Sequence, residues 1–210
     1  KLVQELKAHF VAQGPALLRG KGDGQPGSDD ACPALIGGVV SEDELWACTT
    51  CGACEEACPV FVEPIGKIID MRRNLVLEQG KICGSVMASL RSTQDRGCPW
   101  KGASASRTDW ASGMSVKTLS DNGHASLLFW VGCTEAVLEQ TVNIPIAMAK
   151  ILAAAGVDIG FLGYEESCCG HFARRLGDEY LFQCQAKQNI ETLQRYNVQK
   201  IVTACPHCYH

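Results

Sequence analysis

Cysteine is the residue type with which this chain could do chemistry, since it supplies 13 of the 210 residues and most of them fall into two sets. The first set has the spacing C-x2-C-x2-C-x3-C-P and comprises Cys48, Cys51, Cys54 and Cys58. The second set is dispersed, contains two adjacent cysteines, and comprises Cys133, Cys168, Cys169, Cys205 and Cys208. Adjacent cysteines form a disulfide only with a strained backbone, and the total number is odd. The two sets therefore indicate metal ligands in a reducing compartment.

The spacing of the first set predicts an iron–sulfur site. It is the spacing of the bacterial ferredoxin run, in which three neighbouring thiolates bind one [4Fe-4S] cubane and the fourth ligates a different cluster. Zinc sites instead use four ligands in paired knuckles, and they do not require the final C-P. We expect Cys48, Cys51 and Cys54 to bind one cubane and Cys58 to reach a second one.

A single ferredoxin run is incomplete, because each cluster takes one cysteine from a partner run. No second run stands in this sequence. Cys32 and Cys98 each precede a proline and are candidate fourth ligands, although both also fit an interpretation as loop thiols. The chain begins at Lys1 without an initiator methionine and ends at His210, two residues after a motif cysteine. We therefore expect a piece of a longer polypeptide, with the partner run upstream of Lys1.

Helical signals surround the first set. Residues 1–12 have helical spacing, Ser41 and Glu44 fit a capping box, and 63–79 reads as a helix closed by Gly80. We expect four parts: a helix with a flexible Gly/Pro-rich loop at 1–40, a helical ferredoxin-type region at 41–95, an irregular linker at 96–125, and a domain at 126–210 truncated at its C-terminus.

An alternation of strands and helices positions the second set. Buried-type strands and intervening helices are predicted at 126–131, 134–155, 157–162, 178–196 and 200–203, with a kink at Pro145. This β-α-β-α-β order predicts a parallel sheet. The fold class expected for the chain is therefore mixed: a helical ferredoxin-type region followed by an α/β domain with a parallel sheet.

Each predicted strand ends beside cysteines of the second set. Cys133 follows the first strand, Cys168 and Cys169 follow the second, and Cys205 and Cys208 follow the third. Ligands of open α/β sheets gather beyond the carboxyl ends of the strands. Five thiolates exceed what one zinc ion or one cubane requires, so we expect a larger, non-cubane cluster. The alternative is a group of inert buried thiols.

Several charged residues flank the cysteines. Glu165 and Glu166 are expected either to accept hydrogen bonds from amides of the cysteine loops or to lie on the surface. His171 and His207 are expected either to relay protons or shape a substrate pocket, or else to lie behind the ligands or face solvent. Arginines near both sets either offset cluster charge or lie on solvated helix faces; they are Arg72, Arg73, Arg174 and Arg175.

Composition argues against two kinds of partner. The net charge is −4 without a basic stripe, so we expect no nucleic acid. No apolar run approaches the roughly 20 residues that span a bilayer, and no signal peptide is visible. We therefore expect the fragment itself to be soluble.

The order of a ferredoxin run followed by a lone cysteine, a CCG triplet and a C-x2-C pair resembles a known family. It is similar to the fused iron–sulfur subunit of heterodisulfide reductase and to related oxidoreductases with a CCG domain. The likeness is greatest to membrane-bound reductases that pass electrons from electron-transfer flavoprotein to menaquinone. The segments DELWACTTCGACEEACPV, IIDMRRNLVLEQG, LLFWVGC, EESCCG and IVTACPHCY carry it, over about residues 41–209.

The resemblance implies an iron–sulfur oxidoreductase component with a non-cubane [4Fe-4S] cluster on the second set. It further implies a flavoprotein electron donor, a quinone acceptor reached through a membrane domain absent from this chain, and a place on the cytoplasmic side of the inner membrane. Haem and flavin are then expected only in missing parts or partners. One alternative is a disulfide reductase acting at the non-cubane cluster, and another is a zinc-stabilised interaction module without redox function.

Overall fold

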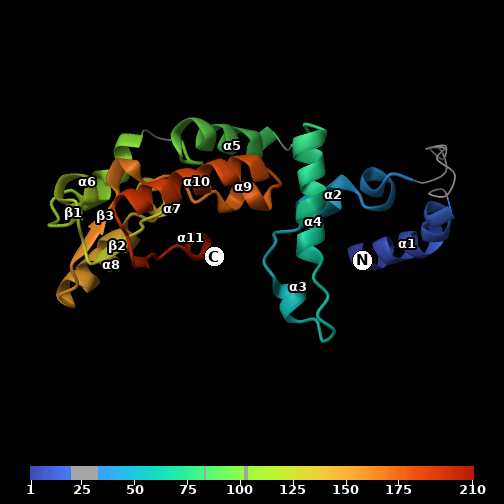
Figure 1. The fold of residues 1–210 in the computed structure, drawn as a ribbon, viewed down its shortest axis with the longest axis horizontal. Coiled ribbons are helices and arrows are strands. Elements are labelled where there is room, and N and C mark those ends of the chain that lie inside the picture. The colour runs from blue at the N-terminus through green and yellow to red at the C-terminus, as the bar shows by residue number, and fades with distance from the viewer. Residues whose placement is uncertain (20–32, 83, 102–103) are drawn as a thin grey trace. The chain divides into compact units, whose positions relative to one another are not determined.

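The computed structural model describes residues 1–19, 33–82, 84–101 and 104–210, and Cys32 and Cys83 lie outside this part (Figure 1). The chain divides into two compact units, Lys1–Gln79 and Gly80–His210. The boundary lies after the predicted helix at 63–79, so that helix and the first cysteine set belong to the first unit. The helix that follows Gly80 belongs to the second unit and not to the unit that contains the first cysteine set.

The described part of the first unit is helical. Its elements are α1 (Leu2–Arg19), η2 (Leu35–Val39), α2 (Glu42–Ala47), α3 (Ala53–Glu56), α4 (Pro64–Arg73) and η3 (Asn74–Glu78). Its core consists of buried Val40, Leu45, Ile68, Met71 and Leu75. Helix α1 continues through Pro15 to Arg19, so the prediction of a loop from residue 13 is wrong for residues 13–19, and residues 20–32 lie outside the described part. The Ala-Leu-Leu-Arg sequence after Pro15 consists of strong helix formers, which explains the extension.

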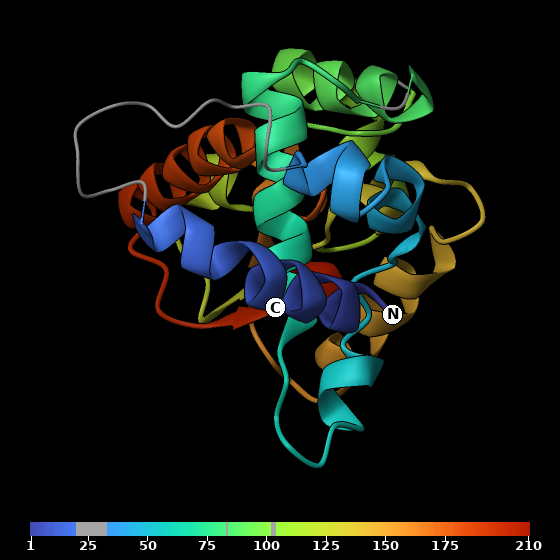
Figure 2. The ribbon, with the colours of Figure 1, turned by 90° about the vertical axis from the view of Figure 1, so that its right-hand side faces the viewer.

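Helix α2 begins with the predicted capping box. The Ser41 Oγ accepts a hydrogen bond from the amide of Glu44 at 3.2 Å, and Glu44 Oε2 accepts one from the amide of Ser41 at 3.2 Å. Figure 2 shows α3 and the loop after it at the end where α4 begins, and the amide of Ile65 donates to Glu55 there at 2.9 Å. These contacts confirm the capping box and fix the start of α4 beside the first cysteine set.

The second unit contains a four-stranded parallel sheet in the order β1-β3-β2-β4. The strands are β1 (Lys117–Thr118), β2 (Leu127–Phe129), β3 (Ile159–Phe161) and β4 (Ile201–Val202). The predicted parallel sheet is confirmed. Strand β1 was not predicted, since it lies in the stretch expected to be an irregular linker and its two residues are too few to show an alternating pattern.

Helices surround this sheet. They are α5 (Gly84–Arg96), η4 (Ser104–Ala111), α6 (Leu119–Asn122), α7 (Cys133–Val137), α8 (Asn143–Ala154), η5 (Gly163–Glu165), α9 (His171–Arg175), α10 (Glu179–Arg195) and α11 (Pro206–Tyr209). The prediction of one kinked helix at 134–155 is wrong, because Leu138 is extended and separates α7 from α8. Pro145 is the third residue of α8, where the missing proline N–H costs no helical hydrogen bond.

Strand β2 shows how the sheet is buried on both faces. Phe129 and Val131 pack into one cluster with Trp110 of η4 and Ala149 of α8. Leu128 and Trp130 pack into another cluster, which includes Leu193 of α10. Because successive strand residues point to opposite faces, the sheet lies between α8 with η4 on one side and α10 on the other. Such a sheet presents its carboxyl edge as a crevice between two layers.

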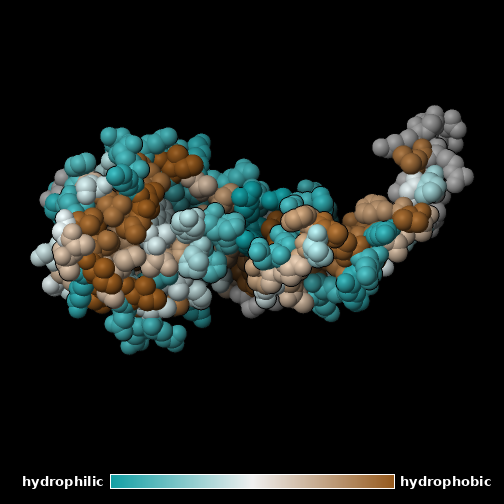
Figure 3. All heavy atoms as spheres, turned by 90° about the horizontal axis from the view of Figure 1, so that it is seen from below, coloured by the Kyte–Doolittle hydropathy of each residue, from teal (hydrophilic) through white to brown (hydrophobic). Residues whose placement is uncertain are grey.

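The surface mixes polar and apolar residues. Figure 3 shows hydrophobic patches among hydrophilic residues on one face of the molecule. In the loop after the first cysteine set, Val60 and Phe61 are 73% and 85% exposed. Across the described residues, we find no helix whose length and hydropathy would let it cross a membrane.

Candidate metal centre

The structure brings the five cysteines of the second set together at the carboxyl edge of the sheet. Cys133 opens α7 after β2, Cys168 and Cys169 lie between η5 and α9, and Cys205 and Cys208 lie at α11 after β4. The Sγ atoms of Cys133 and Cys168 are 3.8 Å apart. Cys169 shifts the pKa of Cys168, and Cys169 and Cys205 shift the pKa of Cys208, so these thiols also lie close to one another. The five cysteines therefore converge on one place.

The pKa values of the five cysteines in the second set are shifted in different directions. The hydrogen bonds shared with neighbouring cysteines lower the pKa of Cys133 and Cys169, and they lower the pKa of Cys205 to about 5. The same hydrogen bonds, together with burial, raise the pKa of Cys168 and Cys208. Since the thiolate is the form that binds metal, the site offers ligands that lose their remaining protons when metal binds.

Glycine lets the loop before Cys133 pass close to the sulfurs of the second set. Gly132 has φ +89°, and a Cβ there would lie 2.9 Å from Glu135 Oε2 and 3.5 Å from the Sγ of Cys208. Gly170 has φ +77°, and its amide donates to the Sγ of Cys168 at 3.5 Å. A side chain at Gly132 would occupy the space between the cysteine loops, so the loop geometry depends on glycine.

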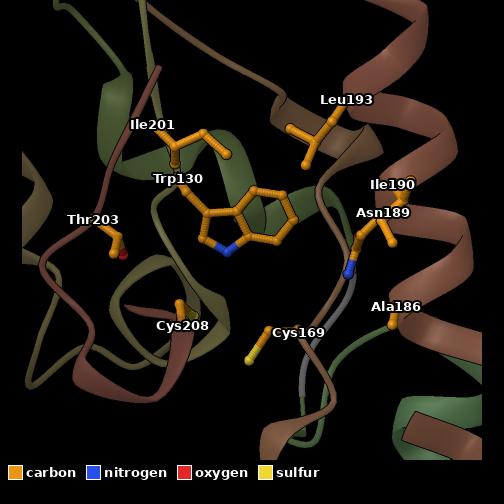
Figure 4. Close-up of a pocket in the computed structure, with 9 residues that line it drawn as sticks. All are labelled: Trp130, Cys169, Ala186, Asn189, Ile190, Leu193, Ile201, Thr203 and Cys208. Carbon is orange, nitrogen blue, oxygen red and sulfur yellow. The ribbon is translucent and has the colours of Figure 1, made fainter. Parts of the chain in front are cut away.

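Two buried polar atoms beside the sulfurs have no hydrogen-bond partner among the described residues: Trp130 Nε1 and Glu135 Oε2. Figure 4 shows the indole nitrogen of Trp130 on the side of the ring that faces Cys169 and Cys208. Burial raises the pKa of Glu135, and the nearby Cys205 adds to this effect. A buried donor without an acceptor is costly, and a group with acceptor sulfurs would satisfy Trp130. The converging thiols and this donor fit an iron–sulfur cluster.

A pocket of about 210 Å³ opens beside two of these sulfurs (Figure 4). Its walls are mostly apolar and consist of Trp130, Cys169, Ala186, Asn189, Ile190, Leu193, Ile201, Thr203 and Cys208. The pocket lies between α10 and β4, on the face of the sheet that carries Trp130. The second cysteine set is therefore approachable from a largely apolar space.

The glutamates before Cys168 have different environments. Glu166 is 4% exposed and accepts hydrogen bonds from the amides of Val131 at 3.0 Å and Gly132 at 2.7 Å. The expectation that a glutamate binds amides of a cysteine loop is confirmed for Glu166. Glu165 instead pairs at the surface with Arg195, with an N–O distance of 2.7 Å. Glu166 also pairs with Arg107, whose role nothing in its Ser/Gly-rich sequence context indicated.

The histidines and arginines near the two cysteine sets also differ in their environments. The ring of His171 contacts the rings of His207 and His210, with centroids 5.2 and 5.4 Å apart. Arg174 lies half exposed beside Glu179 at 3.5 Å, so its surface interpretation is supported. Arg72 is buried, and its Nη2 donates to the carbonyl oxygen of Cys48 at 2.5 Å. Its interpretation as a solvated residue is wrong.

The first cysteine set lies in a loop around the four-residue helix α3. Cys51 and Cys54 are exposed, and Cys48 and Cys58 are half-buried. In the described residues 33–79, no hydrogen bond joins two of these four sulfurs. The structure therefore does not bring the first set together as it does the second.

Backbone amides nevertheless point at sulfurs of the first set. The amide of Thr50 donates to Cys48 Sγ at 3.4 Å, and that of Val62 donates to Cys58 Sγ at 3.2 Å. The amide of Ala53 lowers the pKa of Cys51, and the amides after Cys58 lower the pKa of that thiol. Such amides stabilise thiolates, which suits ligands of a cluster.

Within the ranges that the structure describes, no three Cys, His, Asp or Glu side chains are arranged to hold a single metal ion. A cluster differs from a single ion in that it presents several irons to its thiolates, so its ligands need not surround one point. The cysteines of the second set lie close together without surrounding a single point.

Comparisons with known proteins agree with this chemistry. Residues 127–210 match the family CCG, a cysteine-rich domain. The chain is 36% identical to an EtfAB:quinone oxidoreductase of Syntrophomonas wolfei over 99% of this chain and 32% of that protein. It is 41% identical to the probable iron-sulfur-binding oxidoreductase FadF of Bacillus subtilis over 86% of this chain and 27% of that protein.

A third relative is a probable membrane-anchored ferredoxin of Chromohalobacter salexigens, 37% identical over 100% of this chain and 32% of that protein. The chain thus spans about a third of the length of the curated relatives it matches. No solved structure is significantly similar to it.

Proposed function

We propose that the chain belongs to the iron–sulfur oxidoreductases with a CCG domain, which its matches to that domain and to such oxidoreductases support, and that it transfers electrons from a reduced flavoprotein towards a quinone. The observation that carries the proposal is the convergence of five cysteines at the carboxyl edge of the parallel sheet. Iron–sulfur clusters accept and release electrons one at a time, which suits transfer between a flavin and a quinone.

The cysteines have distinct roles in this proposal. The second set holds a non-cubane [4Fe-4S] cluster through Cys133, Cys168, Cys169, Cys205 and Cys208. In the first set, Cys48, Cys51 and Cys54 hold one cubane, and Cys58 ligates the cubane of an upstream ferredoxin-type run. The amide donors around Cys48 and Cys58 and the convergence of the second set support this assignment.

The chain's other residues shield and orient the second set. Phe129 and Leu162 are almost fully buried in the hydrophobic cores on the two faces of the sheet. These cores exclude water from behind the sulfurs. Asn189 donates to the carbonyl oxygen of Cys168 at 3.0 Å and fixes the CCG loop against α10. Exclusion of water and fixed hydrogen bonds are the means by which a protein sets a cluster potential.

The names of two relatives support the proposed electron donor, electron acceptor and membrane location. One relative is named for EtfAB and quinone, which is consistent with a flavoprotein donor and a quinone acceptor. Another is named as membrane-anchored, which is consistent with a place on the cytoplasmic side of the inner membrane. In this proposal the quinone is reached through a membrane domain outside this chain, haem belongs to that domain, and flavin belongs to the donor.

The proposal is tested by mixing the full-length protein with reduced electron-transfer flavoprotein and a menaquinone analogue under anaerobic conditions. We expect flavin-dependent bleaching of the iron–sulfur absorbance and reduction of the quinone. Cys169→Ser should abolish quinone reduction. Cys184→Ser is the matched control, because Cys184 is an exposed cysteine of α10 outside both sets. Full turnover in Cys169→Ser would contradict the proposal.

The pocket beside Cys169 and Cys208 favours a second candidate, a reductase that splits a disulfide at the non-cubane cluster. Turnover of a heterodisulfide with no electron transfer from the flavoprotein would favour this candidate. A zinc-stabilised module remains the third candidate. Colourless protein that contains zinc and no acid-labile sulfide would identify it and exclude both redox functions.

A further inference from the structure

A buried ion pair lies behind the second cysteine set. Arg107 Nη1 and Glu166 Oε1 are 3.2 Å apart, and each side chain is only 3% exposed. Buried ion pairs contribute little net stability, because desolvation of the two charges offsets their attraction. The pair is therefore not explained by stability alone.

The pair connects the loops that carry the cysteines. Glu166 accepts hydrogen bonds from the amides of Val131 and Gly132, directly before Cys133. Arg107 Nη2 donates to the carbonyl oxygen of Gly97 at 3.1 Å, and the same oxygen accepts a hydrogen bond from the amide of Cys168 at 2.7 Å. One guanidinium and one carboxylate thus tie the loop before Cys133 to the loop before Cys168.

The two charges also act on the sulfurs. The guanidinium of Arg107 bonds the carbonyl oxygen that accepts the Cys168 amide, and the carboxylate of Glu166 bonds the two amides directly before Cys133. Inside the protein, screening by water and salt is weak, so a fixed charge here changes the energy of a nearby charged group more than a surface charge would. Thiolates and sulfides in a cluster add negative charge, which a guanidinium stabilises.

Resting on the proposed cluster, we propose that Arg107 and Glu166 are positioning residues that hold the cysteine loops and set the reduction potential of the second site with opposite signs. Reduction adds negative charge. The positive charge of Arg107 therefore raises the potential, and the negative charge of Glu166 lowers it.

The neighbouring pair gives a matched control. Glu165, the residue before Glu166, pairs with Arg195 at the end of α10 with an N–O distance of 2.7 Å, but these side chains are 33% and 60% exposed. Water and salt screen such a pair. Arg195→Gln removes the same charge as Arg107→Gln, but from the exposed pair of the neighbouring glutamate, so it should leave the potential and the cysteine loops unchanged.

The test uses full-length protein purified anaerobically, with the potential measured by EPR-monitored redox titration. We expect the potential of the second site to fall in Arg107→Gln, to rise in Glu166→Gln, and to stay near the wild-type value in Arg107→Lys, which keeps the charge. Shifts of the same sign in Arg107→Gln and Glu166→Gln, or a shift in Arg195→Gln of equal size, would overturn the proposal.

Hydrogen exchange provides a readout that does not need the cluster. Arg107→Lys loses the guanidinium that donates to Glu166 through one nitrogen and to Gly97 through the other, so the amides of Val131 and Gly132 should exchange at least several-fold faster in it than in Arg195→Gln. Unchanged exchange would refute the positioning role. If iron and sulfide analysis finds no cluster on the second set of the wild type, the proposed function fails, and exchange still decides whether the pair holds the loops. If Arg107→Gln does not fold, Arg107→Lys and Glu166→Gln still test both parts.

Discussion

The two cysteine sets differ in how far the polypeptide alone prepares them. In the second set, three strand ends deliver the sulfurs to one place, and Cys168 and Cys205 are 3% and 6% exposed. In the first set, the sulfurs surround a four-residue helix, and Cys51 and Cys54 are exposed. A sheet fixes its loops through long-range packing, whereas a short loop relies on local hydrogen bonds. The second site is preorganised by the sheet, whereas the geometry of the first depends on its own short loop.

The largest difference should appear when iron is removed. We expect chelation under reducing conditions to raise the hydrogen-exchange rates of the amides at 50–62 by about tenfold or more, because that segment loses the proposed cluster that orders it. Amides at 166–170 should change much less, since the sheet still holds them. Equal loss of protection in the two segments would show that the second site is not preorganised. Amides of α10 serve as an internal control.

Glycine substitutions sharpen the same contrast. Gly132→Ala should destabilise the second unit by about 2–3 kcal/mol and reduce its iron content, because the added Cβ meets Glu135 and the backbone has positive φ. Gly52→Ala should cost about 1 kcal/mol, since Gly52 has φ +83° but open space around its Cβ. Chemical denaturation and iron analysis measure both. Similar iron loss in the two variants would contradict the difference in packing.

Substitutions of two buried tryptophans test whether the indole N–H of Trp130 affects the cluster proposed at the second site. Trp130→Phe removes the indole N–H that faces the sulfurs, so the reduction potential should fall by roughly tens of millivolts. Trp110 also has a buried Nε1 without a partner among the described residues, but it packs against Phe129 and Phe161 inside the core. Trp110→Phe should leave the potential unchanged. Equal shifts would show that the effect arises from packing alone.

The smallest effect is expected at the amino end of the sheet. The hydrogen bond from Lys117, 2.6 Å long, lowers the pKa of Asp158. A depressed folded-state pKa gives a stabilisation that is present above the unfolded pKa and is lost as pH falls through the folded pKa. Asp158→Asn should therefore lower Tm slightly at pH 7 and leave it unchanged at low pH. Thermal unfolding across pH measures this, and a change in cluster content would contradict a purely local effect.

Much of the second site could be predicted from the sequence. The apolar strand runs and the cysteines after them indicated a parallel sheet with its ligands at one edge, because period and position are local signals. The position of the glutamates directly before the CCG triplet predicted that one could accept hydrogen bonds from amides of the cysteine loops. Glu166 accepts such bonds.

The remaining features depend on contacts between distant residues. Arg107 is 59 positions from Glu166 in the sequence, and its segment shows no periodic pattern. Arg72 looked like a residue of a solvated helix face, yet its guanidinium reaches the carbonyl oxygens of Leu45 and Cys48. Strand β1 is too short to identify without its partner β3. Each of these features depends on tertiary packing, which local sequence patterns do not predict.

The most direct test of the account is the iron and acid-labile sulfide content of full-length protein carrying Cys133→Ser together with Cys205→Ser, compared with Cys184→Ser. We predict a loss of about four irons per chain in the double variant, with the cubane EPR signals retained and the Cys184→Ser control complete. Wild-type iron content in the double variant would contradict the claim that the second cysteine set holds its own cluster.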